Sequence, residues 1–205
     1  MIVAAIDVGA PRNIGWAIID DDQVTYGGDL AEFIKQFAAA CQDRPAALGF
    51  EAPLFIPRRK VLSDITKQRE GEAGRPWSAG AGATVTTIGL AVVDYTLSRL
   101  KELIPDKTAT LNWKQWPQGN ELLIWEAFVS GKNHGAKGEH WRDALTAAKG
   151  FGQAYPDFEN HNAIHEMDVV SLAGLSLIRT GWVLPSRETL SQPTLVILPN
   201  QMAKG

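Results

Sequence analysis

The chain begins with short apolar runs that are separated by polar turns. Residues 2–6 and 14–19 are runs of strand length on either side of a turn at 9–13 that contains Gly and Pro. A shorter run at 23–26 follows three consecutive aspartates at 20–22, whose polarity favours a solvated hairpin turn. The N-terminal part of the chain therefore predicts a three-stranded β-meander.

After this meander the pattern alternates between helical and strand periodicity. Asp29 precedes apolar residues at helical spacing and predicts an N-capped helix that ends before Arg44-Pro45. Alternation of this kind predicts an α/β domain with a mixed five-stranded sheet flanked by helices, in the order β-β-β-α-β-α-β-α. The further expected elements are strands at 46–50 and 122–127, helices at 84–103, 139–149 and 162–179, and a last short strand at 195–198.

Length and composition limit the classes of protein that fit. The 205 residues, 45% of them hydrophobic, can bury the core of a single domain spanning 1–205. The single cysteine, Cys41, excludes an intrachain disulfide and suggests a reducing, cytoplasmic location. Residues 2–6 are too short for a membrane span and lack the basic flank of a signal peptide, so no membrane partner is expected. A net charge of −3 gives no overall attraction to polyanions.

Three carboxylates stand at the edges of expected buried elements. Asp7 and Glu51 each directly follow an apolar strand, and Asp168 precedes apolar residues of the expected helix at 162–179. Because an ionised carboxylate is costly to bury unless it is paired or bound to a metal, the three together predict a shared cation site. Oxygen ligands favour Mg²⁺ or Mn²⁺. Taken singly, each residue also fits an ordinary strand end or helix cap.

Two more residues extend this candidate site. On the expected helix, His165 lies three residues before Asp168 on the same face, which suits a proton carrier or ligand, although a solvated first turn fits as well. Glu126 lies inside the apolar run at 122–127, where it needs a metal, a basic partner or an exposed rim. We assign Glu126 as a further metal ligand. Asp143 is assigned to the surface of a helix, without a functional role.

The order of elements, together with these motifs, resembles the ribonuclease H-like fold. In the RuvC-type branch of that superfamily, a first-strand Asp, a fourth-strand Glu or Asp and an acidic residue on a late helix bind divalent metal. Asp7, Glu51 and Asp168 match those positions in order, and His165 matches a His three residues before the late Asp. The Glu-Ala-Pro stretch at Glu51 and the later Glu126 are similar to an uncharacterised family of predicted ribonuclease H-like nucleases. The resemblance implies metal-dependent catalysis by Asp7, Glu51, His165 and Asp168.

Residues 53–83 form a loop-rich insertion after the fourth expected strand, and its cations outnumber its anions. Arginine forks bind phosphate oxygens in bidentate geometry, so this composition is typical of a phosphate-binding surface. A solvated loop of mixed charge explains the same composition. A second polar loop follows the strand at 122–127. The candidate substrate-binding residues of the two loops are Arg58, Arg59, Arg69, Arg75 and Lys132.

These residues predict a metal-dependent nuclease that hydrolyses phosphodiester bonds of nucleic acid, with DNA and RNA not distinguished. Two other classes stay open. The Asp7-Val8-Gly9 turn also resembles the first phosphate-binding turn of actin-like ATP-dependent phosphotransferases, which usually need two copies of the core. A non-catalytic ribonuclease H-like scaffold, whose carboxylates serve turns and caps, predicts no metal binding. The apolar positions of the expected helix at 84–103 fit packing on the sheet or a homodimer interface equally well.

Overall fold

The N-terminal strands form the predicted meander at one side of a larger sheet. The computed structural model describes residues 1–72, 76–129 and 139–199. In it, β1 (Ile2–Asp7) pairs antiparallel with β2 (Gly15–Asp20), and β2 pairs antiparallel with β3 (Gln23–Gly27). The short 3-10 helix η1 (Pro11–Asn13) turns the chain between β1 and β2. The register sets Asp7, the last residue of β1, opposite Gly15.

The rest of the main sheet is parallel to β1. Helix α1 (Leu30–Cys41) begins at the predicted cap, where the Asp29 side chain accepts hydrogen bonds from the backbone N–H groups of Ala31 and Glu32. It leads into β4 (Ala46–Phe50), which pairs parallel with β1, and β7 (Leu122–Ala127) pairs parallel with β4. The carboxyl ends of β1, β4 and β7 therefore lie at one edge of the sheet.

Two additional strands make this sheet larger than the predicted five strands. Strand order is β3-β2-β1-β4-β7-β6, with β6 (Ala109–Thr110) at the end and β9 (Val196–Ile197) also pairing with β7. The run at 195–198 thus contains a strand, as expected. The two-residue β6 carries no periodicity that a sequence pattern can reveal. The described residues form a mixed, mostly parallel sheet flanked by helices, as the α/β prediction requires.

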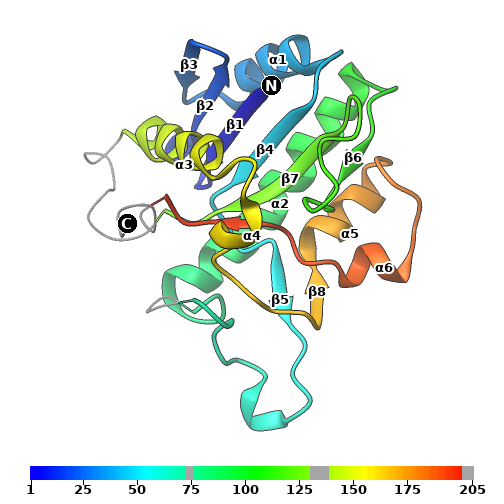
Figure 1. Cartoon of the computed structure of the whole chain (residues 1–205). Coiled ribbons are helices and arrows are strands. Elements are labelled where there is room, and N and C mark those ends of the chain that lie inside the picture. The colour runs from blue at the N-terminus through cyan, green and yellow to red at the C-terminus, as the bar shows by residue number, and fades with distance from the viewer. Residues whose placement is uncertain (73–75, 130–138, 200–205) are drawn as a thin grey trace.

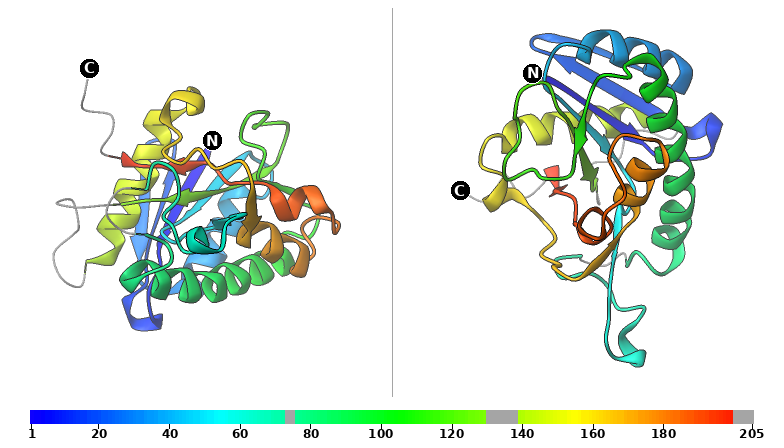
Figure 2. Two further views of the ribbon diagram at one scale, coloured as in Figure 1. Left: turned by 90° about the horizontal axis from the view of Figure 1, so that it is seen from below. Right: turned by 90° about the vertical axis from the view of Figure 1, so that its right-hand side faces the viewer.

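Helices cover both faces of the sheet, as Figures 1 and 2 show. Apolar side chains of α1, α2 (Gly80–Leu103) and α5 (Leu172–Arg179) pack with one face of the strands. Helices α3 (His140–Ala154) and α4 (Phe158–His161) pack on the other face. Strand residues alternate between the two cores, so the short apolar runs of the sequence are buried on both sides.

The insertion folds back on the C-terminal part of the chain. Its first strand, β5 (Phe55–Pro57), pairs antiparallel with β8 (Val169–Ser171), and the segment beyond β5 projects as an arm with the 3-10 helix η2 (Leu62–Asp64) (Figure 1). The chain then returns to the main body before α2. A short helix, α6 (Arg187–Ser191), follows α5 near the C-terminal end of the described chain.

The prediction of one helix over 162–179 was wrong for its first half. Only α5 is helical in this stretch, and its N-cap is Ser171, whose side chain accepts a hydrogen bond from Gly174 N–H. The β-branched residues just before it pair with β5 instead. His165 and Asp168 therefore lie on an irregular segment before β8 and do not share a helix face.

Within the described residues, no helix combines the length and the apolar character that crossing a bilayer requires.

Close packing between β4 and β7 makes a glycine at position 49 necessary. A Cβ atom at Gly49 would lie 2.4 Å from ring atoms of Trp125, which is fully buried. We expect Gly49→Ala to lower the free energy of unfolding by about 1–3 kcal/mol through overpacking. Gly152 is exposed in α3, and a methyl group added there would have nothing within 4 Å, so Gly152→Ala should raise stability by roughly 0.5–1 kcal/mol. Urea unfolding of both variants measures the contrast, and equal effects would contradict this packing.

Candidate active site

A pocket of about 300 Å³ opens where the carboxyl ends of β1 and β4 meet the start of α3. Asp7 is the last residue of β1, Glu51 directly follows β4, and Asp143 lies in the first turn of α3. The backbone N–H of Glu51 donates to Ile6 O at 2.8 Å, which keeps Glu51 beside the end of β1. The polar residues that line the pocket are Asp7, Glu51, Glu72, His140 and Asp143.

His140 contacts Asp7 directly. Its Nδ1 atom lies 2.7 Å from Asp7 Oδ2, and both side chains are partly buried. Gly15 makes this approach feasible, because a Cβ atom there would lie 2.1 Å from the carbonyl carbon of His140 and 2.2 Å from Trp141 N. Since Gly15 is opposite Asp7 in the β1–β2 register, the absence of a side chain seats the start of α3 beside the end of β1.

Asp143 is one of three polar pocket residues, with Glu72 and His140, that the sequence analysis did not assign to the site. It was assigned to a helix surface, whereas it is only 8% exposed and lines the pocket with Asp7 and Glu51. All three carboxylates also take part in polar or electrostatic contacts beyond those described here, so none is without a partner. A sequence signal did exist. Asp143 stands three residues after His140 at the start of the helix that follows the strand at 122–127.

The other side of the pocket is formed by the first turns of α2. Ala81, Gly82 and Val85 line it, and the N-cap residue, Ala79, makes no side-chain capping hydrogen bond. A long helix carries partial positive charge at its N-terminus from N–H groups without intrahelical partners. Further along α2, a Cβ at Gly89 would lie 2.5 Å from Ala52 Cβ, so this helix packs closely on the residue after Glu51. The pocket therefore combines carboxylates with the positive end of a helix.

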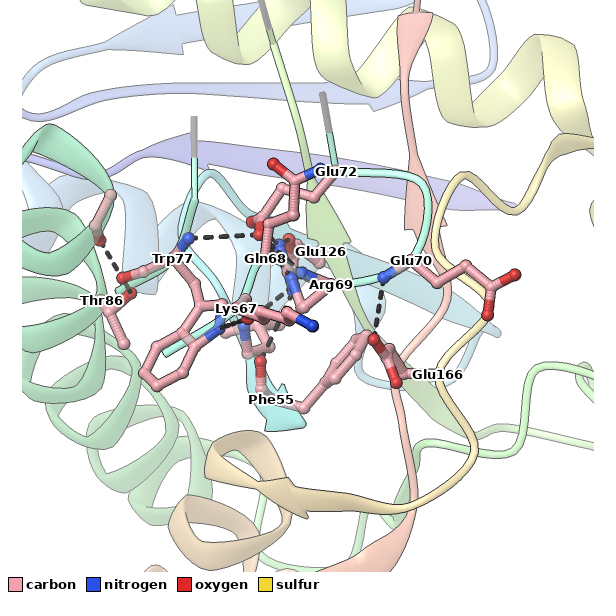
Figure 3. Close-up of polar contacts among 12 residues, drawn as sticks. Phe55, Lys67, Gln68, Arg69, Glu70, Glu72, Trp77, Thr86, Glu126 and Glu166 are labelled. Carbon is pink, nitrogen blue, oxygen red and sulfur yellow. Dashed lines mark hydrogen bonds and ion pairs between the residues drawn. The ribbon is translucent and has the colours of Figure 1, made fainter. Parts of the chain in front are cut away.

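A buried ion network lies behind the pocket and is drawn in Figure 3. Arg69 is 0% exposed, and its Nη1 and Nη2 atoms donate to Glu126 Oε2 at 2.8 Å and Oε1 at 2.7 Å. Nη2 also donates to Glu72 Oε1 at 2.9 Å. Leu54 N–H donates to Glu126 Oε2 at 2.9 Å, and the Arg69 Cζ atom lies over the Phe55 ring. The network joins the insertion to β7 through fully buried groups.

This network changes the roles predicted for two residues. Both carboxylate oxygens of Glu126 accept hydrogen bonds from Arg69. Of the metal, basic partner or exposed rim that its position in an apolar strand required, the structure supplies the basic partner. Arg69, which was predicted to bind substrate, is fully buried in this structure and is paired with Glu72 and Glu126. Burial lowers the pKa of Arg69, but Glu126 and Glu72 outweigh this effect and raise it above the ordinary arginine value.

Arg59 belongs to a second ion pair away from the pocket. Its Nη1 and Nη2 atoms donate to Glu166 at 3.1 and 2.6 Å, and Nη2 also donates to Gln68 O. Glu166 in turn accepts from the backbone N–H of Glu70 at 2.8 Å (Figure 3). These contacts tie the outgoing part of the insertion at Arg59 and its returning part at Gln68 and Glu70 to the segment before β8. The Arg59 fork is occupied by Glu166.

The remaining predicted residues lie apart from the pocket or outside the described chain. Asp168 is half exposed and faces Arg58 Nη1 at 3.5 Å, next to the β5–β8 pair. His165 is exposed, and its backbone N–H donates to Glu70 O at 3.2 Å. Neither His165 nor Asp168 is among the residues that line the pocket. Arg75 and Lys132 lie outside the described residues.

The pocket residues supply suitable donors for a hard divalent cation, but they are not arranged around one. Among the residues that the structure describes, no three His, Cys, Asp or Glu side chains are placed to hold a metal ion together. The oxygen donors of Asp7, Glu51 and Asp143 nevertheless match the ligand preference of Mg²⁺ and Mn²⁺.

Comparisons with protein-family models, with curated proteins and with solved structures found no match to this chain. The candidate site therefore stands on the geometry of its own residues.

Removal of the buried cation should be far more damaging than removal of an exposed one. Arg69→Met would leave Glu72 and Glu126 buried without their cation, so we expect a loss of about 3–5 kcal/mol in the free energy of unfolding. Arg58→Met removes the half-exposed pair with Asp168 and should cost about 1 kcal/mol or less. Chemical denaturation of the two variants measures the difference, and a comparable loss in both would refute the buried network.

Proposed function

We propose that this protein is a metal-dependent nuclease that hydrolyses phosphodiester bonds of nucleic acid. The observation that carries the proposal is the convergence of Asp7, Glu51 and Asp143, from the ends of two parallel strands and the first turn of a helix, on one pocket beside His140. Carboxylates brought together from separate elements are costly unless they serve a cation or a reaction.

The order of elements supports a ribonuclease H-like identity for the domain. The main elements run β1-β2-β3-α1-β4-α2-β7-α3, which is the order that the resemblance implies. In this reading Asp143 on α3, rather than Asp168, takes the position of the acidic residue on the late helix. His140 then stands three residues before that Asp, as the resemblance requires.

The chemistry that we propose uses the residues that line the pocket. A bound Mg²⁺ or Mn²⁺ would supply charge for acidifying a water molecule and for stabilising the negative phosphate. Asp7, Glu51 and Asp143 would hold the cation through oxygen atoms. His140, at hydrogen-bond distance from Asp7, orients that carboxylate and can carry a proton to or from the site. The N-terminus of α2 favours a phosphate group through its partial positive charge.

The buried network supports this pocket from behind. Glu72 lines the pocket and also accepts from Arg69 N–H and Trp77 N–H, so it fixes the returning insertion next to the start of α2. Arg69 holds Glu72 and Glu126 at the same time. We infer that Glu126 serves this support and is not a metal ligand.

The phosphotransferase alternative gains no support from these observations. It usually requires two copies of the core, and the residues that the structure describes form one main sheet and a two-stranded ribbon. A scaffold without catalysis stays distinguishable by experiment, because it predicts no metal binding.

The two candidate aspartates on late elements give a matched test of the site. We expect Asp143→Asn to weaken Mn²⁺ binding and to lower the rate of oligonucleotide cleavage by about 100-fold or more, because a charged ligand is lost. Asp168→Asn, at a half-exposed position paired with Arg58, should leave both unchanged. Isothermal titration with Mn²⁺ and cleavage of mixed DNA and RNA substrates measure the two effects.

Three outcomes separate the classes of function in this test. Loss of both metal binding and cleavage in Asp143→Asn alone supports the nuclease. No Mn²⁺ binding by the wild type contradicts the nuclease and favours the scaffold. If Mn²⁺ binding and cleavage are lost in Asp168→Asn but kept in Asp143→Asn, this pocket is not the site.

His140 and His165 provide a second, independent test, in which one histidine lies in the pocket and the other serves as the control. His140→Ala removes the imidazole that contacts Asp7 and should lower the turnover number by about 100-fold, within the range of general acid–base groups. His165→Ala, at an exposed position outside the pocket, should retain wild-type turnover. Thermal unfolding of both variants checks that neither has lost the fold. If both variants turn over at the wild-type rate, His140 has no catalytic role.

A further inference from the structure

Next to the pocket, two aromatic rings are stacked on the protein surface. Tyr26 of edge strand β3 and Trp141 of α3 have ring centroids 4.0 Å apart and an interplanar angle of 16°. Figure 1 shows α3 lying across the meander, which brings these two elements together. Arg142 follows on α3, and its Cζ atom lies 5.1 Å from the centre of the Trp141 ring. The stack itself therefore consists of Tyr26 and Trp141, with Arg142 close to the Trp141 ring.

The exposure of this stack distinguishes it from the core aromatics. Tyr26 is 52% exposed, whereas the other parallel stacked pair of the described chain, Phe33 with Phe37, is fully buried. If Tyr26 served only to pack α3 against the sheet, burial of its ring would give the largest stabilisation. Tyr26 instead covers Trp141 and leaves about half of its own surface in contact with solvent.

The stack is close to the proposed reaction centre. Trp141 directly follows His140, and its backbone N lies over Gly15. Tyr26 is opposite Ala17 on β2, two residues along that strand from Gly15, which is itself opposite Asp7. A strand spacing of about 4.8 Å and a rise of about 3.3 Å per residue place the Tyr26 Cα roughly 12 Å from the Asp7 Cα. A short stretch of a nucleic-acid strand can span that distance.

We propose that the Tyr26–Trp141 stack is a platform on which an unstacked base of a single-stranded nucleic acid binds beside the pocket. The proposal rests on the proposed nuclease function and names its substrate class. Every base has a π-face, so stacking on an aromatic ring binds single strands with little dependence on sequence. In a duplex the same faces are already covered by neighbouring bases. The half-exposed guanidinium of Arg142 lies beside the stack, but it is paired with Glu139 at 2.8 Å, so the affinity that we propose comes from stacking on the aromatic rings.

The net charge of the protein favours binding through stacked bases over binding through phosphates. With a net charge of −3, the protein has no general attraction to phosphates, and two of its predicted phosphate-binding arginines are occupied by Glu126 and Glu166. Contacts with bases can supply affinity without a broad basic surface. The aromatic platform therefore compensates for electrostatic attraction that Arg59 and Arg69 do not provide.

The test measures binding of a 2-aminopurine-containing oligonucleotide to the full chain in EDTA, so that no cleavage occurs. We expect quenching of the 2-aminopurine fluorescence on binding to wild type. Tyr26→Leu keeps an apolar group against Trp141 but removes the aromatic face, and it should raise the Kd for the single strand about 10-fold. Tyr26→Phe should bind like wild type. Val24→Ala, at another exposed position on β3, is the matched control and should also bind like wild type.

Failure of this inference and failure of the nuclease proposal give different results. If Tyr26→Leu binds the single strand as tightly as wild type while wild type cleaves it, the platform is overturned and the nuclease stands. Equal weakening of duplex and single-strand binding by Tyr26→Leu would also overturn the platform. Tyr26-dependent binding of the single strand, with no cleavage by wild type when Mn²⁺ is added, supports the platform and contradicts the nuclease. No binding of any oligonucleotide by wild type overturns the platform.

Discussion

The buried Arg69 guanidinium is the constraint on which the arrangement around the pocket depends. It is fully buried between Glu126 of β7 and Glu72 of the insertion, with donors to both carboxylates. A buried ion pair of this kind contributes little net stability compared with apolar packing, but leaving one partner alone is costly. The insertion returns to the body of the protein along a path that satisfies all three charges. That return places Glu72 in the wall of the pocket, where its carboxylate also accepts a hydrogen bond from Trp77 N–H ahead of α2.

The pocket itself follows from the direction of the strands and from one small residue. Because β1 and β4 are parallel, Asp7 and Glu51 emerge at the same edge of the sheet. The third group comes from the opposite layer, since α3 covers the face of the sheet away from α1 and α2. Gly15 lets the first turn of α3 approach the edge, which brings His140 to Asp7 and Asp143 into the same cavity. Groups from three elements meet without any of them being close in sequence.

Local patterns were sufficient for the parts of this structure that depend on local forces. The meander, the Asp29 cap and the emergence of Asp7 and Glu51 from buried strands follow from periodicity and capping chemistry, and the structure contains them. The extended conformation before α5 depends on pairing of β8 with β5, more than 100 residues earlier in the chain, and apolar spacing alone indicated a helix there. The partner of Glu126 was equally out of reach, because Arg69 lies in a segment with no regular pattern.

The chain carries two sequences of the form His-x-x-Asp, at His140 to Asp143 and at His165 to Asp168. Local reasoning favoured the second, since apolar residues follow it directly. Topology favours the first, because α3 begins at the edge where β1 and β4 end, whereas the second pair lies on an irregular segment beside the insertion. The short contact between His140 and Asp7 strengthens this choice. An imidazole that holds a carboxylate in a fixed orientation is the support that metal-binding carboxylates generally need, and the exposed His165 has no comparable position relative to the pocket.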